Sequence, residues 1–192
     1  LNALNGNIII VDPRGIAFGP ESQVKARKFT ASGLHMSYDD FMNETGINGS
    51  PDDIRYQFFK DVYAGSVELD GSINAEQVRL IGEKVMNNGS IVTPSGGLVM
   101  MAAGEHIRLA DNPTSNLYVE KLRTNIPLEN YVKNTGTVST DGGKVLLAAG
   151  DILSQAAITD AASFAATATG DVTVNAQVTT TDDIKMRAGR EN

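Results

Sequence analysis

Short segments in which apolar and polar residues alternate recur along most of the chain. Each is a few residues long, is rich in β-branched side chains and is bounded by Gly, Asn or Asp. Alternation with a period of two residues is typical of strands that bury one face, so the pattern predicts many short β-strands. The clearest examples are Val67-Glu-Leu69, Val78-Arg-Leu80, Val99-Met-Met101, Val145-Leu-Leu147 and Val172-Thr-Val174.

The chain also repeats itself. Residues 88–107 align with residues 135–153 when one residue is deleted in a turn, and both contain Gly-Gly, a following Val and then Ala-Ala-Gly with an acid. A weaker copy lies at 183–189, and Gly71-Ser-Ile73 resembles Gly89-Ser-Ile91, 18 residues later. Short strands at a spacing near 20 residues favour an all-β parallel β-helix, in which equivalent side chains form ladders. An antiparallel sandwich is the alternative fold.

The repeat predicts which side chains face the interior and which residues form the corners. We expect Asn side chains to stack where Asn87-Asn-Gly89 meets Asn134-Thr-Gly136, and Gly and Asn to adopt left-handed backbone conformations at corners. The Gly-Gly pairs at 96–97 and 142–143 are also interpreted as corners, since neither has the context of a phosphate-binding loop. The predicted inward ladder consists of Ile73, Val78, Leu80, Ile91, Val99, Met101, Val138, Val145 and Leu147.

Residues 34–63 interrupt the repeating pattern. Ser37 with Asp40 three residues later is a helix-capping pattern, which predicts a helical turn near 38–42. A turn is expected near 46–53 and a strand of an extra-helical hairpin near 54–60, with its aromatic side chains covering one face of the coils.

Composition narrows the possible functions. Lys and Arg number 16 against 23 Asp and Glu, and the formal net charge of −7 argues against nucleic acid as a partner. The absence of Cys excludes disulfides and thiolate chemistry, and two His make a histidine-rich metal site improbable. No apolar run approaches the roughly 20 residues that span a bilayer. We therefore expect no cofactor and no metal.

Catalysis has no positive support in the sequence. The carboxylate pairs at 39–40, 52–53 and 182–183 are adjacent in sequence, so in a strand they point to opposite faces and form no catalytic dyad. His106 is expected on the surface, with Ile107 and Leu109 inward, and His35 is expected to pack beneath the capped turn. We predict no catalytic residues, with a carbohydrate-active β-helix enzyme and a self-assembling extracellular fibre protein as alternatives.

Several motifs follow one another in an order that resembles a known family. Residues 11–19 read Val-Asp-Pro-Arg-Gly-Ile-Ala-Phe-Gly, which first predicts a tight turn with Pro at its second position and Gly where φ is positive. Residues 37–41 read Ser-Tyr-Asp-Asp-Phe, and further matching segments follow at 64–75, 78–82, 85–89 and 97–104. Over residues 6–110 this order resembles the secretion domain of two-partner secretion exoproteins, the group of filamentous haemagglutinin-like adhesins. The family motif is Asn-Pro-Asn-Gly-Ile followed by Phe-Gly, so Asp12 and Arg14 replace its two asparagines.

The resemblance implies a right-handed parallel β-helix and a non-enzymatic role in secretion. It implies residues 1–110 as the secretion-type domain, with its N-terminal cap truncated and an insertion at 34–63, followed by further repeats over 111–192. The partner would be an Omp85-class outer-membrane transporter, and a host-cell or matrix receptor would be bound by regions outside this sequence. The product would be secreted or held at the surface of a Gram-negative bacterium. The implied transporter-recognition motif consists of Asp12, Pro13, Arg14, Gly15, Ile16, Phe18 and Gly19.

Overall fold

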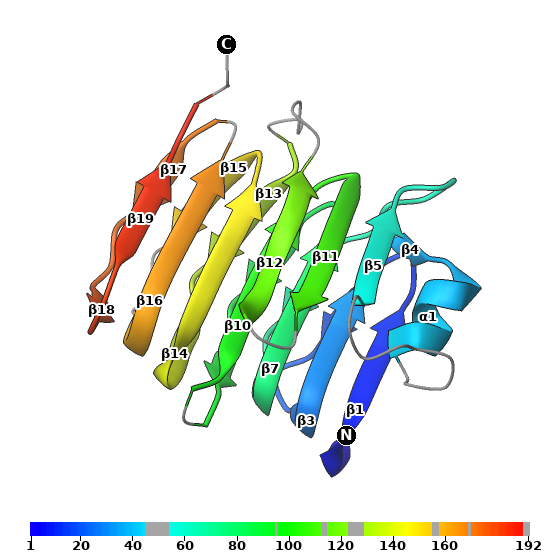
Figure 1. Cartoon of the computed structure of the whole chain (residues 1–192), viewed down its shortest axis with the longest axis horizontal. Coiled ribbons are helices and arrows are strands. Elements are labelled where there is room, and N and C mark those ends of the chain that lie inside the picture. The colour runs from blue at the N-terminus through cyan, green and yellow to red at the C-terminus, as the bar shows by residue number, and fades with distance from the viewer. Residues whose placement is uncertain are drawn as a thin grey trace.

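Every element in the described residues is a β-strand except α1 (Tyr38–Glu44) (Figure 1). The computed structural model describes residues 1–44, 54–94, 96–112, 115–122, 129–154, 158–168 and 170–189. Within these ranges no helix is long and apolar enough to cross a membrane. The elements are β1 (Asn2–Val11), β2 (Ile16–Phe18), β3 (Gln23–Ser32), β4 (His35–Met36), α1 (Tyr38–Glu44), β5 (Ile54–Phe59), β6 (Val67–Leu69), β7 (Ser72–Gly82), β8 (Val85–Asn87), β9 (Ser90–Val92), β10 (Leu98–Ala103), β11 (His106–Asn112), β12 (Ser115–Leu122), β13 (Tyr131–Asn134), β14 (Thr137–Ala149), β15 (Asp151–Ser154), β16 (Ile158–Ala168), β17 (Val172–Val174), β18 (Val178–Thr180) and β19 (Ile184–Arg187).

Two parallel sheets form the body of the molecule. A nine-stranded sheet has the order β1-β3-β7-β10-β14-β16-β18, with β19 pairing β16 and β9 pairing β7 and β14. A six-stranded sheet has the order β17-β15-β13-β8-β6-β2. The chain passes from each short strand of the second sheet to the next longer strand of the first, and we call each such unit a rung. Parallel pairing through the repeat excludes the antiparallel sandwich.

The sequence repeat predicts the register of neighbouring strands. Ser90 pairs with Thr137, 47 residues later, and Leu98 pairs with Lys144, an offset of 144 − 98 = 46 residues. The single deletion in the alignment therefore falls between β9 and β10 in one copy and inside β14, between Ser139 and Lys144, in the other. Because a slip of one residue would turn every side chain to the other face, this agreement fixes the buried set.

The interior between the two parallel sheets is filled by ladders of small and branched side chains. All nine predicted ladder residues lie in this cluster and are at most 2% exposed. The rows run straight across the nine-stranded sheet, so that one of them contains Ile8, Phe29, Val78, Val99, Val145, Phe164 and Ile184. Each rung therefore buries its apolar side chains mainly against the rungs on either side of it.

The corners confirm the predicted Asn stacking and correct the role given to glycine. Asn87 Nδ2 donates to Asn134 Oδ1 at 2.7 Å, and Asn134 Nδ2 donates to Ser154 Oγ at 3.3 Å, all within the buried interior. None of the corner asparagines has a positive φ, and neither do Gly89 and Gly136. These two glycines are needed because a Cβ on Gly136 would collide with the backbone oxygen of Gly89.

The two glycines of each Gly-Gly corner serve different purposes: the first adopts a positive φ, and the second allows the backbones of two rungs to approach closely. Gly96 and Gly142 have φ values of 74° and 75°, in the left-handed region expected from the sequence. Gly97 and Gly143 instead stack, since a Cβ on Gly143 would meet the backbone oxygen of Gly97. A side chain at the second position would therefore separate the two rungs at that corner.

A third, antiparallel sheet lies over the outer face of the nine-stranded sheet. Its order is β12-β11-β5-β4 (Figure 1). The predicted cap is present at its edge, because Asp40 N donates to Ser37 Oγ at 3.1 Å, and α1 extends beyond the predicted turn to Glu44. The predicted strand is β5, whereas the turn expected near 46–53 lies outside the described residues.

Strands β11 and β12 are an addition that the sequence did not predict. They pair antiparallel with each other, and β11 also pairs with β5. The expected boundary between residues 110 and 111 therefore falls inside β11. Ile107 is buried, but beneath the antiparallel sheet rather than in the ladder interior, and His106 is half-buried rather than a surface residue. The side chain of Leu109 lies outside the described set.

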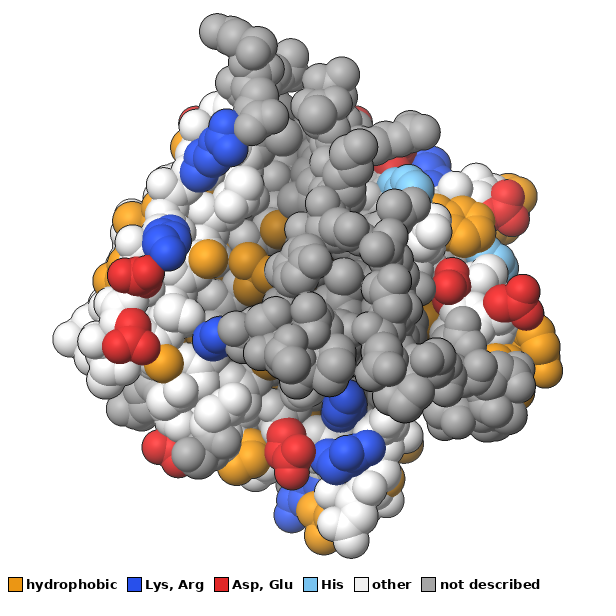
Figure 2. Space-filling model, in the orientation of Figure 1, with side chains coloured by type: hydrophobic (Ala, Val, Ile, Leu, Met, Phe, Trp, Pro, Cys, Tyr) orange, Lys and Arg blue, Asp and Glu red, His pale blue; other side chains and the backbone are white. Residues whose placement is uncertain are grey.

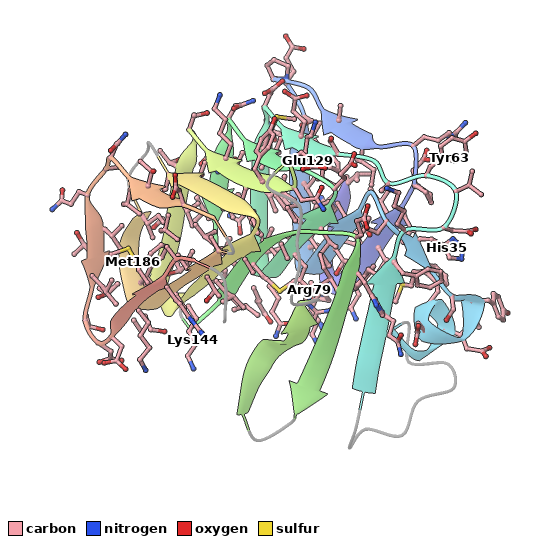
Figure 3. All side chains as sticks on the ribbon, turned by 90° about the horizontal axis from the view of Figure 1, so that it is seen from above. His35, Tyr63, Arg79, Glu129, Lys144 and Met186 are labelled. Carbon is pink, nitrogen blue, oxygen red and sulfur yellow. The ribbon has the colours of Figure 1, made fainter. Side chains whose placement is uncertain are left out.

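The antiparallel sheet seals a second apolar cluster. Phe58 and Ile107 from this sheet pack with Ile81, Met100 and Ala102 of the nine-stranded sheet. Phe58 is 1% exposed, so this aromatic residue covers the coils as the sequence predicts. Arg79, also 1% exposed, lies on the same face of β7, and its Nη2 donates to Gln77 Oε1 at 3.2 Å (Figure 3).

Candidate functional site

The motif at residues 12–19 begins with a tight turn at one end of the parallel sheets. Gly15 N donates to Asp12 O at 2.9 Å, which closes the turn around Pro13. Arg14 N donates to Asp12 Oδ1 at 3.0 Å, so the aspartate side chain also holds the turn. Gly15 has a φ of 116°, a conformation that side-chain-bearing residues rarely adopt. The turn predicted from Pro13 and Gly15 is therefore present.

An exposed ion pair covers this turn. Arg14 Nε donates to Asp12 Oδ1 and Arg14 Nη2 to Asp12 Oδ2, each at 3.1 Å. The side chain of Arg14 is 80% exposed and that of Asp12 is 37% exposed. Hydrogen bonds from the Arg14 side chain and backbone lower the pKa of the Asp12 carboxyl, and the same contact raises the pKa of Arg14. The bidentate geometry gives the turn a fixed charged surface.

The turn rests on glycines from two other segments. Asp12 N donates to Ser32 O at 3.0 Å, and Ile16 N donates to Ser66 O at 2.9 Å. Gly65 lies directly against the turn, where a Cβ would collide with the backbone nitrogen of Gly15. Gly65 N in turn donates to Gly33 O at 2.7 Å. Gly33, Gly65 and Ser66 are thus supporting residues that sequence reasoning missed, because no local pattern connects positions so far apart.

The apolar half of the motif belongs to the core. Phe18 is 8% exposed and meets Phe29 edge to face with ring centroids 5.6 Å apart. Ile16 is half-buried and packs against the same cluster. In the folded chain, Arg14 and Gly19 are exposed and Phe18 is buried, while the other motif residues are half-buried.

The two histidines lie in one row of the antiparallel sheet. His35 and His106 both pair with Phe59 from opposite sides, and the His35 ring contacts that of Phe59 edge to face at 5.0 Å. His106 Nε2 is 3.4 Å from Gln57 Oε1. His35 therefore packs against β5, and this row brings no serine or acid into a catalytic arrangement with either ring among the described side chains.

A small open hollow lies beside this row. It has a volume of about 230 Å³ and is lined by Phe59, Lys60, Asp61, Glu105 and His106. Lys60 Nζ donates to Glu105 Oε1 at 2.7 Å, and this hydrogen bond raises the pKa of Lys60. The ion pair engages Lys60 and Glu105, whereas Asp61 and His106 also line the hollow.

In the described carboxylate pairs, one acid caps a helix and another forms a surface ion pair. Asp40 bonds Ser37 at the start of α1, and Asp183 forms an exposed ion pair with Lys185 at 2.7 Å. The pair at 52–53 lies outside the described residues. Across the described part of the chain, no group of three or more His, Cys, Asp and Glu is placed to hold a metal ion. On the face shown in Figure 2, acidic and basic side chains are interspersed.

Comparison with known proteins identifies the fold. No protein-family model matches the sequence, and no curated protein sequence matches it. Among solved structures, the HMW1 secretion domain from Haemophilus influenzae is similar, with a TM-score of 0.77 and 23% sequence identity over 91% of this chain. The chain has the fold of this secretion domain. The resemblance noted in the sequence is therefore confirmed at the level of the fold. The match covers 46% of the solved chain, so the present chain spans about half of its length.

Proposed function

We propose that the chain is the secretion domain of a large two-partner secretion exoprotein of the filamentous haemagglutinin-like adhesin type. The observation that carries the proposal is the combination of this fold with the ordered motifs at 11–19 and 37–41. The first motif forms a supported turn, and the second caps the helix at the edge of the antiparallel sheet. The fold alone would be compatible with many functions, so the motifs are the more specific support for the proposal.

The architecture we propose is a right-handed parallel β-helix. The straight rows of side chains and the parallel register of successive rungs support it. Residues 1–110 would be the secretion-type domain with the insertion at 34–63, and residues 111–192 would continue the same solenoid. The hairpin β11–β12 would then be a second excursion from the coils at the junction of these parts.

Export would proceed through a partner transporter of the outer membrane, to the cell surface or the medium. The chain would cross unfolded, and rungs would stack outside the cell. Each new rung would bury apolar side chains worth roughly 25 cal/mol per Å² and add ladder hydrogen bonds, so stacking would favour forward movement. Receptor binding would belong to regions beyond these residues. The role is non-enzymatic, which agrees with the secretion domain found among similar structures.

The recognition motif we propose consists of Asp12, Pro13, Arg14, Gly15, Ile16, Phe18 and Gly19. The turn presents Asp12, Pro13 and Arg14 at the surface, whereas Phe18 contributes to the core. The two groups should therefore respond differently to substitution. Changes in the turn would act on recognition, and a change at Phe18 would act on folding, at a cost of about 3–5 kcal/mol for removal of a buried ring.

The test is export of the chain through a co-expressed two-partner secretion transporter, measured beside the melting temperature of the purified variants. Gly15→Val should reduce export strongly. Gly142→Val is its matched control, because both glycines have positive φ but only Gly15 lies in the motif. Equal loss of export in both variants would mean that folding, and not the motif, is being measured. Export of the unmodified chain without any transporter would contradict the proposed function.

The double variant Asp12→Asn with Arg14→Asn is a sharper probe of recognition. It replaces the ion pair by the two residues that the family motif carries, and it keeps the Pro and Gly of the turn. Export through a family transporter should rise or stay level. A clear fall with an unchanged melting temperature would show that the motif does not serve this kind of transporter.

A further inference from the structure

The antiparallel sheet joins strands that leave two different rungs. β4 follows β3 after Gly33 and Leu34, whereas β11 follows β10 after Gly104 and Glu105. Between them lies β5, which pairs with β4 on one side and with β11 on the other (Figure 1). In the nine-stranded sheet, β7 lies between β3 and β10 in the same way. The strands β4, β5 and β11 therefore connect the first and the third of three successive rungs, and we call these strands the strap.

The backbone pairing of β5 is supplied mainly by β11. Its pairing with β4 covers two residues of β5, Phe58 and Phe59, whereas its pairing with β11 covers all six, from Ile54 to Phe59. Even a complete pair of antiparallel strands is only marginally stable in water without further packing. We therefore expect β5 to have no stable place over the rungs until β11 is present.

Side chains fasten the same junction. Lys60, directly after β5, donates from its backbone N to Glu105 O and from Nζ to Glu105 Oε1, each at 2.7 Å. Beneath the strap, Phe58 of β5 and Ile107 of β11 belong to one apolar cluster and are 1% and 0% exposed. These contacts join β5 to β11 or to the corner before it, across more than 40 residues of sequence.

The rungs beneath the strap have an interior of their own. β7 pairs with β3 over nine residues and with β10 over six, independently of the strap. The ladder cluster, which contains Val78 and Val99, is separate from the cluster under the strap. The outer face of β7 also carries a charge, because Arg79 is 1% exposed beside Met100. Burial of a guanidinium carries a desolvation cost, so opening the strap should cost less free energy than separating two rungs.

We propose that the strap is a separate conformational unit, which closes over the rungs when β11 pairs with β5 and opens while the rungs stay stacked. In the open form β5 leaves the outer face of the nine-stranded sheet, and the ladder interior is unchanged. Closure follows the stacking of β3, β7 and β10, because β11 continues from β10. In the export proposed above, the strap would therefore close only after residues 105–112 and residues 54–60 have both emerged.

Hydrogen exchange of the purified 192-residue chain tests the strap. It needs no transporter, so its outcome is independent of the proposed function. Ile107→Ala removes buried atoms beneath the strap and should speed exchange of the β5 amides by about tenfold or more, with little change in β10. Val99→Ala is the matched control, because Val99 is equally buried but lies in the ladder interior, so β7 and β10 should be affected. Unchanged exchange of β5 in Ile107→Ala, or equal acceleration of β5 and β10, would overturn the proposal.

A cross-link between β5 and β11 gives a second test, since the chain has no cysteine of its own. Phe59 and His106 are directly opposite each other, and such positions place their Cα atoms about 4.5–5.5 Å apart, within the range of a disulfide. Phe59→Cys with His106→Cys should therefore form a disulfide that prevents opening. Compared with the reduced form of the same variant, exchange of β5 should slow by about tenfold or more while β10 changes little. Failure to form the disulfide, or equal effects of oxidation on β5 and β10, would contradict a strap that opens separately.

Discussion

At the scale of single residues, the Asp12–Arg14 pair shows how a turn acquires a fixed charge pattern. The Asp12 carboxylate accepts hydrogen bonds from the backbone and the side chain of Arg14, and these bonds lower its pKa. A lowered pKa in the folded state means that this interaction favours the turn above the ordinary pKa of an aspartate. The contribution is lost as the pH falls through the lowered pKa. Because the pair is exposed, salt will weaken it.

A carboxyl titration followed by NMR tests this pair directly. Asp12 should titrate below an ordinary exposed aspartate, and Arg14→Ala should raise its midpoint toward the ordinary value. Asp183 is a matched control, since its pKa is lowered by Lys185 and should not respond to Arg14→Ala. An unchanged Asp12 midpoint in that variant would show that Arg14 does not hold the carboxylate.

Close approach of backbones gives a second prediction at this scale. Gly136→Ala would place a Cβ against the backbone oxygen of Gly89, where no flexible side chain can move aside. We expect it to lower the free energy of unfolding by about 1–3 kcal/mol, as overpacking does. Gly19→Ala is the control, because nothing lies within 4 Å of its Cβ position and its φ is not positive. Chemical denaturation measures the free energy of unfolding of both variants. Equal values for Gly136→Ala and Gly19→Ala would contradict the close backbone contact at this corner.

Sequence reasoning predicted some of these residues and not others for a physical reason. The Asn87–Asn134 contact follows from the repeat, because aligned corners must stack if the rungs do. The support of Gly15 by Gly65 and Gly33 could not be predicted in this way. These glycines belong to different segments, and their spacing follows no repeat. The burial of Phe18 follows from its position in β2, two residues after Ile16, but the motif alone does not say whether a partner or the core uses it.

At the scale of strands, the alternation within each rung determines which side chains are buried. Val99 is fully buried in β10, whereas Val92 in β9 is 41% exposed. Val99→Asp would place an unpartnered carboxyl in the ladder interior and should destabilise the fold by roughly 2–7 kcal/mol. Val92→Asp makes the same chemical change in solvent and should cost little. Melting temperatures of the two variants test the register, and similar values would contradict it.

The strands that escaped prediction are those whose partners are distant. The alternation in β11 resembles that of the ladder strands, yet β11 pairs antiparallel with β5, about 50 residues earlier in the chain. Alternation reports only that one face is buried. It does not distinguish the interior of the parallel sheets from the space beneath the antiparallel sheet, where Ile107 lies. Only the internal repeat carries information about pairing, and it includes no more than the first two residues of β11 and none of β12.

At the scale of the whole molecule, the fold is a row of rungs with a lateral cover. Middle rungs have neighbours on both sides, and the antiparallel sheet covers part of the nine-stranded sheet over β7 and β10. The end rungs have one neighbour only. In such an arrangement each rung is stabilised chiefly by the adjacent ones, so stability should fall from the middle toward the ends.

Hydrogen exchange can measure this gradient along the chain. Backbone amides of β7, β10 and β14 should exchange most slowly, and those of β17, β18 and β19 should exchange fastest, because opening the last rung breaks contacts on one side only. Uniform protection from β1 to β19 would mean that the molecule opens as one unit, and that its ends are no weaker than its middle.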